Sequence, residues 1–184
     1  ASISGFCESR NHEIIISVWN GRVYHLDKEK DEFIPYPDKM RSRNPTVMVQ
    51  DNEQDYFWLA TWGDGVVRFD PSAPGDSMFV YSEIPVNAAG EEDGLILSLA
   101  QDDKLGYIWL TTGHDFMALQ IQPDRTLKQL KFPAGLLPVN HMLVEVLKGK
   151  ECLWVSAFDR PSFILHLMDN ITKDYALPAL ADRV

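Results

Sequence analysis

The sequence contains four copies of one pattern, and this repetition limits the possible folds more than any other feature does. Each copy opens with a large apolar residue, alternates into a small or hydroxyl residue, passes through a polar turn and resumes as a second apolar strand. The copies span residues 15–27, 58–70, 109–120 and 154–167. Because their opening residues stand at 15, 58, 109 and 154, the period is about 46 residues, which is typical of propeller blades and too long for leucine-rich repeats.

Further short apolar segments surround each hairpin. One precedes each copy, at residues 46–51, 95–102 and 142–148, with a weaker version at 2–9. One follows each copy and ends in proline, at residues 32–37, 78–85, 127–133 and 171–178. Proline cannot donate to a strand ladder and belongs at a strand end or edge. Each repeat is therefore expected to contain four short strands, and no long window has helical periodicity.

Repeated units of four antiparallel strands predict an all-β protein built of β-propeller blades. The expected blades cover residues 1–37, 38–85, 86–133 and 134–184. Neighbouring blades would bury both faces of the middle strands, which explains the nearly continuous apolar runs at 56–61 and 106–112. A β-sandwich with strands of irregular length is the alternative fold.

Composition fits a folded globular chain, with 45% hydrophobic and 24% charged residues. The formal net charge of −10 argues against a nucleic-acid surface and against an anionic membrane surface. No apolar run approaches the length of about 18 residues that a membrane helix needs. The two cysteines, Cys7 and Cys152, have no metal-site spacing, although a disulfide between them is possible in an oxidising compartment.

No recognisable catalytic or cofactor motif is present. The five histidines show no HxH or HExxH spacing, no serine lies in a GxSxG elbow, and no glycine loop for phosphate occurs. The acidic run 91–93 is expected to be solvated loop charge. We therefore expect no metal, no cofactor and no catalysis in this segment.

Candidate ligand contacts lie at the hairpin turns. Trp58, Trp109 and Trp154 share one repeat position and are expected in the core, whereas Trp19 and Trp62 stand beside the turns. There they would either stack on a sugar ring or cap the blade edge. Gly63 and Gly65 are expected to have positive φ.

Between these glycines, Asp64 would either bond its own backbone or face a ligand. Turn residues at the corresponding positions are Asn20, His114, Asp115, Asp159 and Arg160. The loops 37–45, 87–94 and 134–141 are expected on the same face. In the first of these loops, Arg41 and Arg43 would either meet a carboxylate or sulfate or remain solvated. Together the turns predict a polyol or uronic-acid site.

The second and third repeats resemble the short propeller repeats of the periplasmic sensor regions of hybrid two-component regulators, which are common in gut Bacteroidetes. The matching residues are Asp51, Trp58, Thr61, Gly63, Gly65, Phe69 and Asp70 in the second repeat, and Asp102, Gly106, Trp109, Thr112 and Gly113 in the third. The fourth repeat departs at Lys148 and Ala157, and the first has Ile15 where tryptophan is expected.

The resemblance implies a periplasmic, ligand-sensing segment of a seven-bladed propeller that recognises a glycan or its breakdown product. It also implies a membrane helix and a histidine kinase elsewhere in the parent protein, and it is compatible with a homodimer formed through that receptor. This segment would itself contact no nucleic acid and insert into no membrane. A closed four-bladed ring is the alternative architecture. A protein-interaction scaffold and a propeller lyase or hydrolase acting on glycans are the alternative functions.

Overall fold

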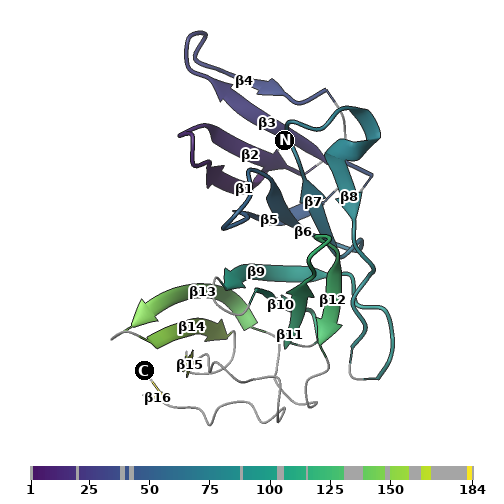
Figure 1. Ribbon diagram of the computed structural model, residues 1–184, viewed down its shortest axis with the longest axis vertical. Helices are drawn as coiled ribbons and strands as arrows, with labels where there is room; N and C mark the ends of the chain where they lie inside the picture. Colours follow the sequence, from purple (N-terminus) through teal and green to yellow (C-terminus); the bar gives the residue numbers. More distant parts are fainter. Residues whose placement is uncertain are drawn as a thin grey trace. The chain divides into compact units, whose positions relative to one another are not determined.

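The computed structural model describes residues 2–19, 21–37, 40–41, 44–87, 89–102, 106–114 and 116–130, and the backbone of four further strands within 139–183. Within these residues the chain forms sixteen strands (Figure 1). The first eight are β1 (Ile3–Glu8), β2 (Ile14–Val18), β3 (Arg22–Asp27), β4 (Glu32–Pro35), β5 (Pro45–Gln50), β6 (Phe57–Thr61), β7 (Val66–Phe69) and β8 (Phe79–Tyr81), with a 3-10 turn η1 (Gly75–Met78) before β8. The others are β9 (Ile96–Asp102), β10 (Tyr107–Thr112), β11 (Phe116–Ile121), β12 (Leu127–Leu130), β13 (Val139–Leu147), β14 (Lys150–Ala157), β15 (Phe163–His166) and β16 (Asp182–Arg183).

The strands form four separate four-stranded sheets, in the orders β1-β2-β3-β4, β5-β6-β7-β8, β9-β10-β11-β12 and β13-β14-β15-β16. Each sheet is an antiparallel meander of consecutive strands, which is the topology of a propeller blade. The prediction of four-stranded antiparallel repeats is thereby confirmed. The strand expected at 171–178 lies outside the described residues, and the fourth partner in the last sheet is β16, which pairs with β15.

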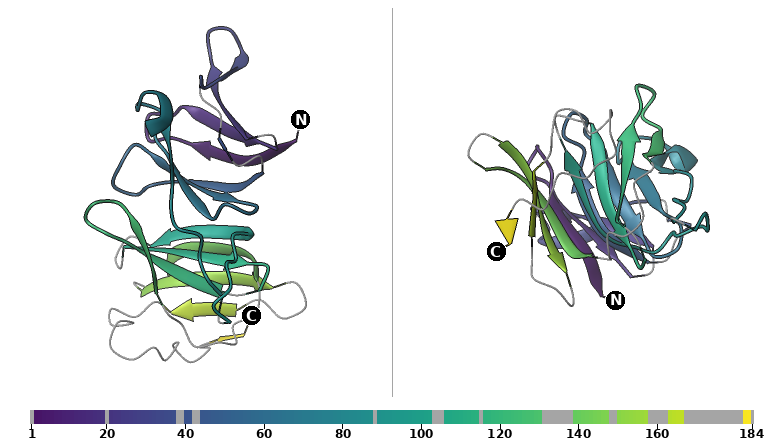
Figure 2. Two further views of the ribbon diagram at one scale, coloured as in Figure 1. Left: turned by 90° about the vertical axis from the view of Figure 1, so that its right-hand side faces the viewer. Right: turned by 90° about the horizontal axis from the view of Figure 1, so that it is seen from below.

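The chain divides into two compact units. The first unit comprises residues 1–84 and 94–96, and the second comprises 85–93 and 97–184. Within the first unit, β1 and β5 lie next to each other and the two sheets stack face to face (Figure 2). Ile15, Met48, Leu59 and Phe69 meet in the core between these sheets. Packing of one blade on another therefore completes the hairpin, as the repeat pattern predicts.

The middle strands are buried on both faces. Every residue of β6 is buried, and so is every residue of β10 in the second unit. Trp58 and Trp109 are among the largest fully buried side chains of the described residues, as expected for a repeated core position. The side chain of Trp154 lies outside the described residues.

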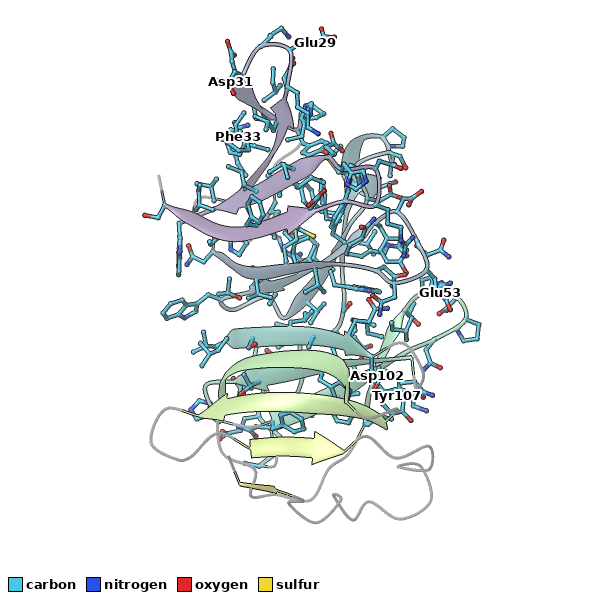
Figure 3. The ribbon with its side chains drawn as sticks, turned by 90° about the vertical axis from the view of Figure 1, so that its left-hand side faces the viewer. Glu29, Asp31, Phe33, Glu53, Asp102 and Tyr107 are labelled. Atoms are coloured by element: carbon cyan, nitrogen blue, oxygen red, sulfur yellow. The ribbon has the colours of Figure 1, made fainter. Side chains whose placement is uncertain are left out.

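In each of the two middle sheets, a buried aspartate stands where the first strand meets the first turn. Asp51 directly follows β5, and Asp102 is the last residue of β9. The indole nitrogen Nε1 of Trp58 donates to Oδ2 of Asp51 at 2.8 Å, and that of Trp109 donates to Oδ2 of Asp102 at 3.5 Å. Figure 3 shows Asp102 close to Tyr107, at the end of the sheet where β9 turns into β10. In these two sheets the opposite end carries the hairpin turn between the second and third strands, where candidate residues lie.

Candidate functional site

In the first unit, the hairpin turns and the loops that connect one sheet to the next are joined by backbone hydrogen bonds. Met40 donates its N–H to the carbonyl of Gly21 at 2.9 Å, and Trp62 donates to that of Asn44 at 2.8 Å. Gly63 donates to Gly94 at 2.8 Å, across the second connecting loop. The expectation that turns and loops share one face is thus confirmed for this unit.

The turn between β6 and β7 requires its glycines. Gly63 has a φ of 120° and Gly65 a φ of 69°, values that strain any residue with a Cβ atom. The buried hydroxyl of Thr61 donates to the carbonyl of Gly65 at 2.8 Å and accepts the N–H of Asp64 at 3.1 Å. This closed ring of contacts fixes where Trp62 and Asp64 project.

Trp19 and Trp62 form an exposed aromatic pair. Their ring centroids are 5.4 Å apart with the planes at 62°, an edge-to-face contact. Trp19 remains 38% exposed and Trp62 51% exposed, which is high for indoles that touch each other. Their backbones are held, because Trp19 donates to the carbonyl of Ser2 at 2.9 Å and Trp62 donates to that of Asn44. The pair therefore presents apolar ring surface from a fixed backbone.

Arg41 approaches the same turn from the first connecting loop. Its guanidinium carbon lies 4.2 Å from the centre of the Tyr81 ring, and its backbone N–H donates to the Tyr81 hydroxyl. Nη2 of Arg41 stands 3.9 Å from Oδ1 of Asp64. The Asp64 side chain thus faces an arginine, a contact that neither of the two roles predicted for it includes. We call Trp19, Trp62, Arg41, Asp64 and Tyr81 the aromatic–arginine cluster.

The second unit places another candidate, His114, against a buried carboxylate. Oδ2 of Asp93 accepts the hydroxyl of Thr112 at 2.5 Å and lies 3.1 Å from Nδ1 of His114. The Asp93 side chain is 4% exposed and that of His114 is 72% exposed. The expectation that the acidic run 91–93 is merely solvated is wrong for Asp93, because the connecting loop folds its carboxylate inward between these two donors. His114 is thereby oriented with its ring toward solvent.

The remaining predicted contacts lie outside the described residues: Asn20, Arg43, Asp115, Asp159 and Arg160. Sequence reasoning missed two partners, Tyr81 and Asp93. Tyr81 ends the last strand of its sheet, and an aromatic residue there gives no local sign of a contact with residue 41. Asp93 stands in an acidic run, and such a run predicts exposure to solvent rather than a buried contact.

Two further features of the described ranges bear on the requirements of a metal site and of a membrane span. Among the described residues, no group of three or more His, Cys, Asp or Glu side chains is placed to hold a metal ion. Cys7 is a free thiol, and burial raises its pKa; the side chain of Cys152 lies outside the described part. Over the same part of the chain, no helix has the length and apolarity needed to cross a membrane.

Comparison with known proteins gives structures of similar fold. No protein-family model and no curated protein matches the chain. Virginiamycin B lyase from Staphylococcus aureus superposes with a TM-score of 0.63 at 16% identity, over 91% of this chain and 53% of the lyase chain. PorZ, a surface component of the type-IX secretion system of Porphyromonas gingivalis, gives 0.67 at 16% identity, over 96% of this chain and 27% of its own.

A third similar structure is the extracellular domain of a putative one-component system from B. thetaiotaomicron. It gives a TM-score of 0.55 at 13% identity, over 84% of this chain and 18% of that chain. At such identities the likeness shows the fold alone, and it shows that the sheets are β-propeller blades rather than layers of a sandwich. The chain spans about half of the lyase chain and smaller shares of the other two.

Proposed function

We propose that this chain is a ligand-sensing propeller segment of a periplasmic receptor, and that the aromatic–arginine cluster contacts a glycan or its breakdown product. The observation that carries the proposal is the exposed, touching pair of Trp19 and Trp62 beside a charged pair. Flat aromatic surface suits the apolar face of a pyranose ring, while Arg41 and Asp64 supply a donor and an acceptor for its polar groups.

The parent protein is proposed to be a hybrid two-component regulator whose histidine kinase lies outside this segment. The extracellular domain of the putative one-component system from B. thetaiotaomicron supports this context, since it shares the fold over 84% of this chain. A ring of about seven blades is also proposed, because four blades cover slightly more than half of the lyase chain. In this proposal the segment performs no catalysis, and any homodimer forms through the remainder of the receptor.

An enzymatic role in glycan cleavage is the second candidate, favoured by the His114 ring that Asp93 orients. A histidine held by a carboxylate is a common arrangement for a general base. A protein-interaction scaffold is the third candidate, because fold does not determine function.

Calorimetric titration of the chain with defined oligosaccharides separates these candidates, with chromatography of each mixture to detect cleavage. Binding without cleavage is expected, and Trp62→Ala should weaken it strongly. The matched control is Phe33→Ala, which removes an exposed aromatic ring from β4, away from the hairpin-turn end (Figure 3). Cleavage would overturn the sensing proposal in favour of an enzyme, and absence of binding across the panel would favour a scaffold.

A further inference from the structure

Arg41 is held in place more firmly than an ordinary loop arginine. The preceding residue, Met40, is buried in the core of the first unit and its N–H bonds to the Gly21 carbonyl. The N–H of Arg41 itself bonds to the Tyr81 hydroxyl. The backbone at residue 41 is therefore anchored from both sides of the loop before any ligand binds.

The Arg41 guanidinium is oriented, and no described residue accepts a hydrogen bond from its N–H groups. The Tyr81 ring stacks beneath it at 4.2 Å, which restricts the plane of the group. Asp64 stands at 3.9 Å, beyond hydrogen-bond distance. The side chain is 70% exposed, and within the described residues it donates no side-chain hydrogen bond. A cation prepared in this way is suited to a planar anion that approaches its N–H edge.

Trp62 lies on the same turn as Asp64, the residue whose carboxylate faces Arg41. Trp62 and Asp64 are two positions apart in the β6–β7 turn, and the Trp62 N–H bonds to Asn44 of the loop that carries Arg41. A sugar ring on Trp62 would therefore carry its substituents toward Arg41, with Asp64 available to accept a hydroxyl.

We infer that the ligand of the aromatic–arginine cluster is an acidic saccharide, whose uronic-acid carboxylate pairs with the fork of Arg41 while its ring stacks on Trp62. This inference rests on the proposed glycan-binding function and specifies its substrate class. The bidentate pair compensates for the acidic net charge of −10, which would otherwise disfavour an anionic ligand. A neutral sugar would offer the oriented guanidinium no carboxylate at hydrogen-bond distance, since Asp64 stands at 3.9 Å.

The decisive test compares two ligands that differ only at C6: cellotetraose and its C6-oxidised form, the β-1,4-linked tetramer of glucuronic acid. Calorimetry at low and moderate salt is expected to show that the acidic tetramer binds tighter by about tenfold, the gain typical of a charge-assisted hydrogen bond. Added salt should reduce this preference.

Three variants test whether the preference for the acidic tetramer arises at Arg41. Arg41→Gln should abolish the preference for the acidic tetramer, because glutamine has no positive charge. Arg41→Lys should restore the preference only in part, because an ammonium lacks the planar fork. Lys128→Gln is the matched control, since it removes one positive charge from β12 of the other unit, where Lys128 is the exposed residue of the strand. Circular dichroism confirms that each variant is folded.

The outcomes separate this inference from the proposed function. Equal binding of both tetramers, or a preference that survives Arg41→Gln, overturns the acidic-ligand inference while glycan binding stands. Failure of both tetramers and of the wider panel overturns both proposals. A preference that is lost equally in Lys128→Gln indicates general charge attraction and also overturns the role of Arg41.

Discussion

The indole N–H of Trp58 donates a 2.8 Å hydrogen bond to Oδ2 of Asp51, and both side chains are completely buried. The other carboxylate oxygen accepts the N–H groups of Glu53 and Gln54 at 3.0 and 2.9 Å. One aspartate thus links the end of β5, the following turn and the middle of β6. Figure 3 shows Glu53 in that turn. The same pairing recurs at 3.5 Å between Trp109 and Asp102.

Trp58→Phe is expected to destabilise the chain more than Trp109→Phe. Both variants lose ring volume in a core position, but only the first removes a short hydrogen bond to a buried carboxylate, at a cost of about 1–3 kcal/mol in the free energy of unfolding. Urea unfolding followed by circular dichroism measures both. Equal destabilisation of the two variants would show that ring volume, rather than the hydrogen bond, determines the loss.

Thr61→Val should loosen the turn that carries Trp62. Valine keeps the shape but removes the hydroxyl that bridges Gly65 and Asp64, leaving the Asp64 N–H without its acceptor. The expected loss is about 1–3 kcal/mol of stability, with weaker saccharide binding. Thr61→Ser retains the hydroxyl and should behave like the parent in urea unfolding and calorimetry. A serine variant as impaired as the valine variant would contradict this account.

Gly94→Ala is expected to displace the β6–β7 turn, because Gly94 packs directly against Gly63 of that turn. A Cβ atom on Gly94 would collide with the carbonyl group of Gly63 and crowd Ile84, and Gly94 also accepts N–H bonds from Gly63 and Gly65 at 2.8 and 3.3 Å. Gly90→Ala is the control, because its Cβ would meet nothing within 4 Å and only its φ of 81° would be strained. We expect a lower unfolding temperature and weaker binding for Gly94→Ala, and a change in stability alone, of about 1 kcal/mol, for Gly90→Ala. A Gly94→Ala variant with unaltered binding would argue against coupling between this loop and the turn.

Asp27 should stabilise the β3–β4 turn at neutral pH but not in acid. The pKa of Asp27 is lowered by its contact with the Lys30 ammonium at 2.8 Å, and by the N–H groups of Lys30 and Glu29. A carboxyl whose pKa is lower in the folded state contributes stability above its unfolded pKa and loses it as the pH falls through the folded value. Asp27→Asn should therefore differ from the parent in unfolding temperature near neutral pH and converge with it in acid. An NMR titration that finds the Asp27 pKa unchanged on unfolding would refute the assignment.

Local sequence patterns were sufficient to predict the strands. These patterns are alternating apolar residues, prolines at strand ends and the paired glycines of the β6–β7 turn. Each acts over a few residues, so it can be recognised without knowing which residues pack against the strand. The repetition then predicted that each strand set is a blade, because no single sheet with two apolar faces is stable alone. The boundaries proposed between the repeats remain predictions, as do the ligand contacts.

The tertiary structure alone decided which side chains meet at the hairpin-turn end. Tyr81 lies beneath Arg41 although 40 residues separate them, and Asp93 reaches His114 across 21 residues. Such contacts depend on how each connecting loop returns to its sheet, a path that no periodicity encodes. The sequence therefore determined the repeated strands, because these follow from local chemistry. Only packing decided that one carboxylate of an acidic run is buried and that one arginine is oriented over a tyrosine ring.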